Sequence, residues 1–181
     1  MRVVLVLVAL LLGLCACGTD KEQPDMTSSD APAMESVVAD YSAMRTEMFR
    51  ALDAELGKRP WDLSPNNATM VRSGCRQGEP TDGERATLPS YYFPGTYDTR
   101  DWKKAAEVVW KVGREHGFTR TGTTVDMSDD LEVYGQDDHG GRYVFGLAAN
   151  TVLGITTGCH RWRSAPTADA PKTEIPDYDT H

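Results

Sequence analysis

Apolar side chains recur every three or four positions over residues 34–56, which is the spacing of one face of an α-helix. The residues on this face are Met34, Val37, Val38, Tyr41, Met44, Met48, Leu52 and Leu56. Pro32 before the segment and Gly57 after it are typical of helix boundaries, and Pro60 prevents the helix from continuing. We therefore expect a long first helix that buries this face.

A second apolar stripe predicts another helix, which begins after Asp98 or Thr99 as the capping residue and ends near Gly117. The stripe consists of Trp102, Ala105, Ala106, Val109 and Val112. From Phe118 onward the apolar period changes to two, which is typical of half-buried strands. Four strands are expected there, over residues 119–127, 131–136, 142–149 and 151–162.

Short turn-forming segments separate these four strands, so consecutive strands are expected to pair antiparallel as a β-meander. Before the second helix, residues 68–76 are a candidate strand that ends at Cys75, whereas residues 77–98 are expected to be irregular. The most economical arrangement is an α+β two-layer sandwich, in which both helices pack on one face of an antiparallel sheet.

The beginning of the chain has a different pattern. Residues 3–14 form an uninterrupted apolar run. Twelve helical residues cover roughly 18 Å, which is well short of the roughly 30 Å hydrocarbon core of a bilayer. An arginine at position 2, a short apolar run and then small residues are typical of a secretory signal peptide rather than of a membrane span.

The end of this segment, Leu14-Cys15-Ala16-Cys17, resembles the lipobox of bacterial lipoproteins. The resemblance implies cleavage before Cys17 and an acyl anchor on Cys17 that holds the protein in the cell membrane, with the following domain on the extracytoplasmic side. Modification of Cys15 instead would place Leu14 directly before the cleavage site, where a small side chain is required. Several acyl chains at about 0.8 kcal/mol per buried methylene give a stable anchor.

The expected organisation is therefore a signal peptide over residues 1–16, an acylated cysteine and flexible tether over 17–33, an α+β domain over 34–163 and a disordered acidic tail over 164–181. Without the signal peptide, which includes one arginine, the formal net charge changes from -8 to about −9. This balance argues against a nucleic-acid partner and against a polybasic membrane contact.

Two cysteines remain in the domain, Cys75 and Cys159. In a secreted chain an even pair predicts a disulfide, here between the early strand and the end of the last strand. The alternative is a redox or metal pair, but the chain has neither C-x-x-C spacing nor a second Cys/His cluster. We expect the structural bridge.

Signals for catalysis are weak in this sequence. The chain has no G-x-S-x-G motif, and we expect His116 to lie at a helix end and His139 in a turn, with His160 following Cys159. The acidic segment 126–141 suggests calcium, but Leu131 stands where an EF-hand loop needs glycine. Asp137, Asp138 and His139 remain an alternative weak cation site, although turn residues need no ion. We expect no catalytic residue, no metal and no cofactor.

The segment 88–98 contains the best candidate binding residues, Tyr91, Tyr92, Phe93 and Tyr97. Exposed aromatic side chains stack on sugars and anchor protein partners. In the alternative interpretation the same side chains turn inward and cover the core.

Several short motifs together resemble the LppA-like lipoproteins of actinobacteria. They are "RSGC" at 72–75, "LPSYYFPG" at 88–95 and the closing "GCHRW" at 158–162. The resemblance implies a surface lipoprotein without an assigned activity. We expect a non-enzymatic domain that binds an envelope protein or glycan through the aromatic segment or through the sheet face away from the helices. The alternative is a small glycan or lipid bound between the aromatic segment and the sheet.

Overall fold

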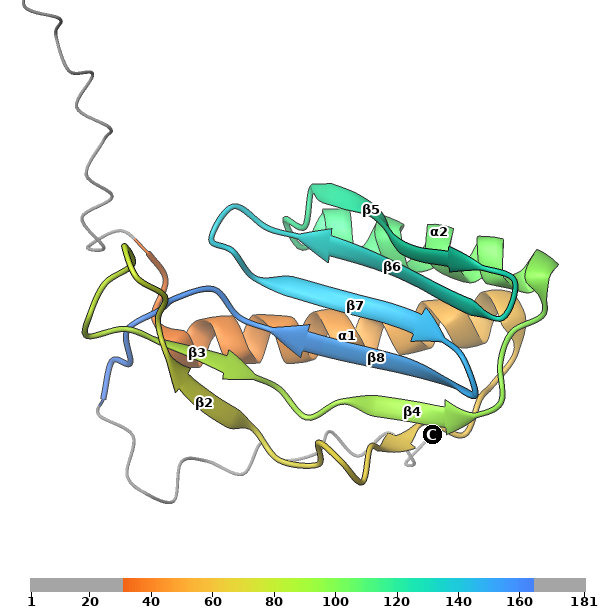
Figure 1. Cartoon of the computed structure of the whole chain (residues 1–181), viewed down its shortest axis with the longest axis horizontal. Coiled ribbons are helices and arrows are strands. Elements are labelled where there is room, and N and C mark those ends of the chain that lie inside the picture. Colours follow the sequence, from red (N-terminus) through yellow and green to blue (C-terminus); the bar gives the residue numbers. More distant parts are fainter. Residues whose placement is uncertain (1–30, 165–181) are drawn as a thin grey trace, which may run out of the picture.

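The computed structural model describes residues 31–164 (Figure 1). The predicted signal peptide, Cys17, most of the tether and nearly all of the C-terminal tail therefore lie outside the described residues. The elements in chain order are α1 (Met34–Leu56), β1 (Asp62–Leu63), β2 (Val71–Gly74), β3 (Glu84–Thr87), β4 (Tyr91–Pro94), α2 (Thr99–Glu115), β5 (Arg120–Met127), β6 (Asp130–Gln136), β7 (Arg142–Leu147) and β8 (Asn150–Thr156).

Both helices lie where the apolar spacing predicts them. The side chain of Asp98 caps α2 by accepting a hydrogen bond from the backbone N–H of Asp101 at 2.8 Å. After α2, Gly117 has a φ of 85°, a conformation that glycine adopts without strain. The start of α1 has no side-chain cap; instead the N–H of Met34 donates to the carbonyl of Arg161, 2.9 Å away.

The strands form one antiparallel sheet in the order β1-β4-β8-β7-β6-β5, and β3 pairs with both β2 and β8. Successive pairing of β5, β6, β7 and β8 confirms the β-meander. The edge strand β5 carries a register shift between Thr123 and Val125. Such a bulge makes an exposed edge a poorer template for pairing with another strand.

The expectation that residues 77–98 are irregular is wrong, because this segment contributes β3 and β4 to the sheet. β3 reads "ERAT" and has a single apolar side chain, Ala86, so it shows no apolar alternation. Its place is set by partners distant in sequence, namely β2 and Thr156 of β8. β1, with two residues, was also not predicted.

Both helices cover the same face of the sheet, as Figure 1 shows, and they also pack on each other. Side chains of both helices and of β4, β6, β7 and β8 form one apolar core between the two layers. The predicted α+β two-layer sandwich is confirmed. None of the helices within residues 31–164 is both long enough and apolar enough to span a bilayer.

Candidate functional site

The predicted aromatic binding segment lies mostly in the core. Tyr91, Phe93 and Tyr97 are 7%, 1% and 3% exposed, respectively. Phe93 packs edge-on against Trp61 and Tyr97, with ring centroids 4.9 and 5.4 Å away. The prediction that these three residues form a surface contact is corrected: Tyr91 and Phe93 lie on the core side of β4, and Tyr97 follows β4 and packs against Phe93. The alternative interpretation, in which these side chains turn inward and cover the core, is confirmed for all three.

Tyr92 is the exception, because it points to the opposite face of β4 and is partly exposed. Within this segment, β4 pairs with β8 along its whole length, from Tyr91 opposite Leu153 to Pro94 opposite Asn150. A pocket between the aromatic segment and the sheet, which was the alternative site, is therefore not formed.

The structure joins Cys75 and Cys159 in the expected disulfide, with the two Cα atoms 5.6 Å apart. The bridge connects the end of β2 to the segment that follows β8. Gly83 lies against it, and a Cβ atom there would come within 2.6 Å of the Cys159 sulfur. Glu79 approaches both sulfur atoms in the metal-like arrangement, but the disulfide already uses the two sulfur ligands.

The segment after β8 also holds the start of α1. The side-chain Nδ1 of His160 lies 2.9 Å from the carbonyl oxygen of Pro32. The carboxylate of Glu35 accepts hydrogen bonds from the backbone N–H groups of Arg163 and Ser164, at 3.0 and 3.1 Å. We call this end of the domain, where the described chain begins and β8 ends, the entry end.

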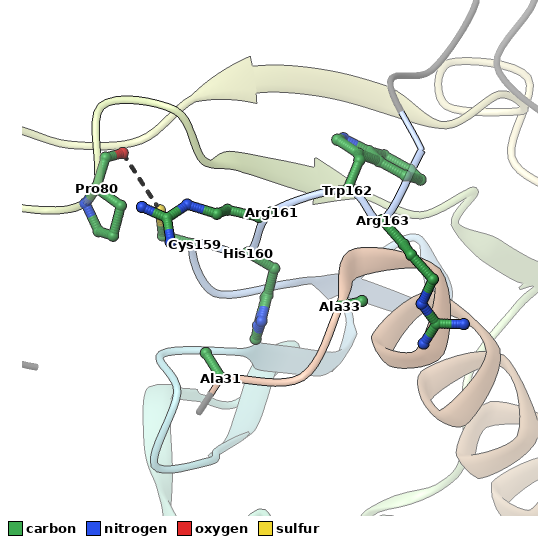
Figure 2. A pocket seen from close by; sticks show the side chains of 8 residues that line it. All are labelled: Ala31, Ala33, Pro80, Cys159, His160, Arg161, Trp162 and Arg163. Carbon is green, nitrogen blue, oxygen red and sulfur yellow. Dashed lines mark hydrogen bonds between the residues drawn. The ribbon is translucent and has the colours of Figure 1, made fainter. Parts of the chain in front are cut away.

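A small cavity of about 160 Å³ lies at the entry end. Figure 2 shows its lining side chains, which come from the beginning of the described chain, from Pro80 and from the segment after β8. His160 lines it and is buried, and its Nε2 atom has no hydrogen-bond partner among the described residues. Burial lowers the pKa of His160 below its ordinary value of 6.5, despite the opposing hydrogen bond to Pro32.

A second buried polar cluster lies beneath the β6–β7 turn. The Tyr41 hydroxyl donates to the carboxylate of Asp137, which also accepts from the backbone N–H groups of His139 at 3.0 Å and Gly141 at 2.7 Å. Burial, and then the hydrogen bond to Asp137, raise the pKa of Tyr41 above its ordinary value. The Asp137 carboxylate is therefore satisfied by hydrogen-bond donors of the protein itself, which explains why an acidic residue occupies this turn.

The other two histidines lie near the positions expected for them. His116 is the C-cap residue of α2, and its Nε2 atom lies 2.8 Å from the Glu47 carboxylate on α1, so it joins the two helices. His139 is in the β6–β7 turn, and its ring centroid is 5.9 Å from that of His160.

The remaining surface of interest is the sheet face away from the helices, which faces the reader in Figure 1. No element within residues 31–164 covers it, and we call it the open face. On the central strands its side chains alternate with core residues: Val152 and Gly154 on β8 alternate with buried Leu153 and Ile155. Strand pairing therefore assigns the other members of the face by register.

Three transverse rows of paired residues make up the open face. One row at the entry end contains Val71, Thr87, Thr156, Arg142, Gln136 and Arg120. The middle row contains Gly154, Val144, Tyr134 and Gly122. The row towards the opposite end contains Asp62, Tyr92, Val152, Gly146, Glu132 and Val125.

The open face also carries the exposed large hydrophobic side chains of the described residues. These are Val71, Met127 and Val152, which are 56%, 57% and 39% exposed. Met127 belongs to this face because it pairs with Asp130, whose neighbour Leu131 packs against the core. Val71 and Met127 lie on strands at opposite sides of the sheet, with Val152 on a strand between them. Apolar residues distributed over one uncovered face are compatible with an extended interaction surface.

The sequence predicted this face as a contact site, but it did not single out the individual residues that form it. The alternation of apolar and polar positions in the meander could have shown that Val144, Tyr134 and Val152 point away from the core, because each lies between two buried residues. It could not show that Val71 joins them, because β2 reaches the sheet only through β3.

Comparison with known proteins identifies the family. A family model named LppA, described as a lipoprotein confined to pathogenic Mycobacterium, matches residues 17–162. No curated protein matches the chain. The crystal structure of LppA from Mycobacterium tuberculosis is similar, with a TM-score of 0.59 and 18% identity over 72% of this chain and 79% of that chain.

A second similar structure is that of a DUF4853 family protein from Actinomyces odontolyticus. Its TM-score is 0.55 at 14% identity, and the match covers 81% of this chain and 78% of that chain. At these identities the two structures show that the fold is shared, and they say nothing about the residues of the open face.

Proposed function

The chain belongs to the LppA lipoprotein family, and from this premise we propose that it is held in the bacterial cell membrane by lipid on Cys17 and acts outside the cytoplasm by binding an envelope protein. The binding site in this proposal is the open face. The function is that of an interaction domain, without a catalytic step.

Two features support the anchor. The family match begins at residue 17, which is the cysteine at which the lipobox predicts the mature chain to start. From Cys17 to the start of the described chain at Ala31 there are about 14 residues, which as a flexible tether would span about 20 Å. The domain would thus stay close to the membrane while keeping its faces accessible.

The anchor is tested by Cys17→Ser in the native host. We expect this variant to remain uncleaved or to leave the membrane fraction, because the acyl acceptor is gone. Cys15→Ser is the matched control, since it also removes one thiol from the lipobox but leaves Cys17 in place. A Cys17→Ser protein that is still processed and membrane-bound would refute acylation at this residue.

The observation that carries the binding proposal is that Val71, Met127 and Val152, the exposed large hydrophobic side chains, share the open face. Single exposed apolar residues are common on protein surfaces, but a common face suggests a contact. Tyr92 and Tyr134 border the same surface and add aromatic area that is partly exposed. Aromatic residues are enriched at the energetically important positions of interfaces.

The open face is tested by affinity capture of the acylated protein from intact envelopes. Val152→Asp places a carboxylate at an exposed apolar position of the open face, and we expect it to remove the specifically captured proteins. Ala43→Asp is the matched control, because it adds the same charge on the exposed side of α1. Unchanged capture by Val152→Asp, with unchanged folding, would exclude the open face as the contact.

A further inference from the structure

We propose that the partner of the open face is a second copy of the same face, so that two domains stack sheet against sheet with their strands antiparallel. This inference rests on the proposed function, because it assumes that the open face is a contact surface. It adds the identity of the partner that covers that face. The resulting dimer has four layers, with the two sheets inside and the two helix pairs outside. Aligned sheets pack in this way about 10 Å apart.

The first argument is that the two ends of the open face carry opposite charge. Arginines lie at the entry end, whereas carboxylates lie towards the opposite end, where the β5–β6 hairpin turns. The arginines are Arg85, Arg120 and Arg142, and the acidic residues are Asp62, Asp130 and Glu132. An antiparallel stack places each basic end over the acidic end of the other copy, so the face is complementary to itself.

The second argument is that key charges have no partner within the described domain. Arg142 forms no ion pair among residues 31–164; its guanidinium lies over the Tyr134 ring, 4.4 Å from the centroid, and donates to Thr124 at 3.1 Å. Its Nε atom is buried without a hydrogen-bond partner. Glu132 likewise lies outside the ion pairs of the described chain. Arg85 and Arg120, by contrast, already pair within the domain, with Glu79 at 2.8 Å and with Asp138 at 3.9 Å. Arg142 and Glu132 are therefore the two charges on which this argument rests.

The third argument is geometric. A two-fold axis between the two sheets, parallel to the middle row and above Val144 and Tyr134, places the row at the entry end of one copy over the row at the opposite end of the other. Arg142 then lies over Gly146 of the second copy, which pairs with Glu132 on the neighbouring strand. Gly146 has no side chain, and the Glu132 side chain packs beside it instead, with its Cγ 3.4 Å from where a Cβ atom of residue 146 would lie. In the stack this carboxylate therefore faces the side of the second copy from which Arg142 extends over Tyr134.

The size of the face is also sufficient. Five paired strands at about 4.8 Å spacing, with about six residues each at about 3.3 Å, give a face of roughly 24 by 20 Å. Two such faces remove on the order of 1,000 Å² from water, which is near the lower limit for a specific interface. The two entry points would lie roughly 20 Å apart, and about 14 residues separate Cys17 from the described domain in each copy, which is enough chain to anchor both copies in one membrane.

The test uses the full mature chain from residue 17 with Cys17→Ser, which needs no detergent, and measures mass by sedimentation equilibrium. We expect a concentration-dependent dimer for this parent chain. Arg142→Glu and Glu132→Arg, each added separately, should weaken dimerisation by at least about tenfold, because like charges then face each other twice across the two-fold axis.

The decisive arm mixes the two variants. An equimolar mixture of Arg142→Glu with Glu132→Arg should form heterodimers, since each altered charge then meets its opposite in both contacts. Circular dichroism and thermal melting of each variant check that it is folded. A loss of dimer caused by local damage to the sheet would not be repaired by mixing, so failure of the mixture to associate overturns the proposal.

Two outcomes separate this inference from the proposed function. A parent chain that stays monomeric, while Val152→Asp still abolishes capture of a different envelope protein, overturns the second copy as occupant and leaves the contact surface standing. A dimer that is unaffected by Arg142→Glu, Glu132→Arg and Val152→Asp lies elsewhere on the molecule, and it overturns the inference as well.

Discussion

At the scale of single residues, the buried polar groups of the entry end are arranged around two side chains, Asp137 and His160. Asp137 accepts three hydrogen bonds through its carboxylate, so its burial is compensated. His160 is buried with only Nδ1 paired, which the neutral ring tolerates better than the charged ring.

His160 predicts a specific loss of stability below neutral pH. Because burial lowers its folded-state pKa below the ordinary value of 6.5, it stabilises the fold above that pH, and this contribution is lost as the pH falls towards the folded-state pKa. Urea unfolding at about pH 7.5 and pH 5.5 should show a smaller decrease for His160→Asn than for the unmodified chain. Asparagine keeps a donor for Pro32 but does not titrate. Equal decreases in the two proteins would contradict this assignment.

At the scale of elements, the alternation of side chains along β4 determines which of its aromatic residues lie in the core and which lies on the open face. β4 is only four residues long, and it alternates between a core side and the open face. Phe93 contacts Trp61 and Tyr97 on the core side, whereas its neighbour Tyr92 points away from the helices and pairs in register with Val152. The two adjacent residues therefore have different roles, stability for Phe93 and surface for Tyr92.

This difference predicts unequal costs of truncation. Phe93→Ala should lower the free energy of unfolding by about 3–5 kcal/mol, since it leaves a cavity among packed rings. Tyr92→Ala should cost less than about 1 kcal/mol, because its side chain is partly in solvent. Chemical denaturation of both variants provides the measurement. A Tyr92→Ala variant as unstable as Phe93→Ala would place both residues in the core.

The elements that could be predicted from the sequence are those whose pattern is local. The helices α1 and α2 and the meander β5–β8 each contain enough periodic positions to show their type and facing side. β3 and β1 could not be predicted, because their pairing with distant strands, and not their own sequence, defines them. The aromatic candidate site failed for a related reason: the inward side of Tyr91 and Phe93 follows only from the pairing of β4 with β8, and Tyr97 is buried through its packing against Phe93 and Phe145.

At the scale of the whole molecule, the disulfide joins parts of the chain that the meander alone would leave separate. Cys75 follows β2, Cys159 follows β8, and 84 positions separate them in sequence. The segment after Cys159 contacts the start of α1 through His160 and Arg161. Loss of the bridge should therefore loosen the entry end as well as increase the entropy of the unfolded chain.

The double variant Cys75→Ala with Cys159→Ala should be less stable by about 2–4 kcal/mol, because the closed loop is long. Thermal or chemical denaturation measures the difference, with and without a reducing agent. The reductant should destabilise the unmodified protein and leave the double variant unchanged. If removal of both cysteines has no effect on stability, the bridge does not constrain the fold.

The central claim is that the open face is covered by a partner in the cell envelope. It is tested most directly by a photo-crosslinking residue at Val152 in the membrane-anchored protein, irradiated in intact cells, with the same residue at Ala43 on the outside of α1 as control. We predict a discrete crosslinked product from position 152 and none from position 43. A mass of twice the chain would identify a second copy as the partner, and another mass would identify a different protein. No product from position 152, or equal products from both positions, would contradict the claim.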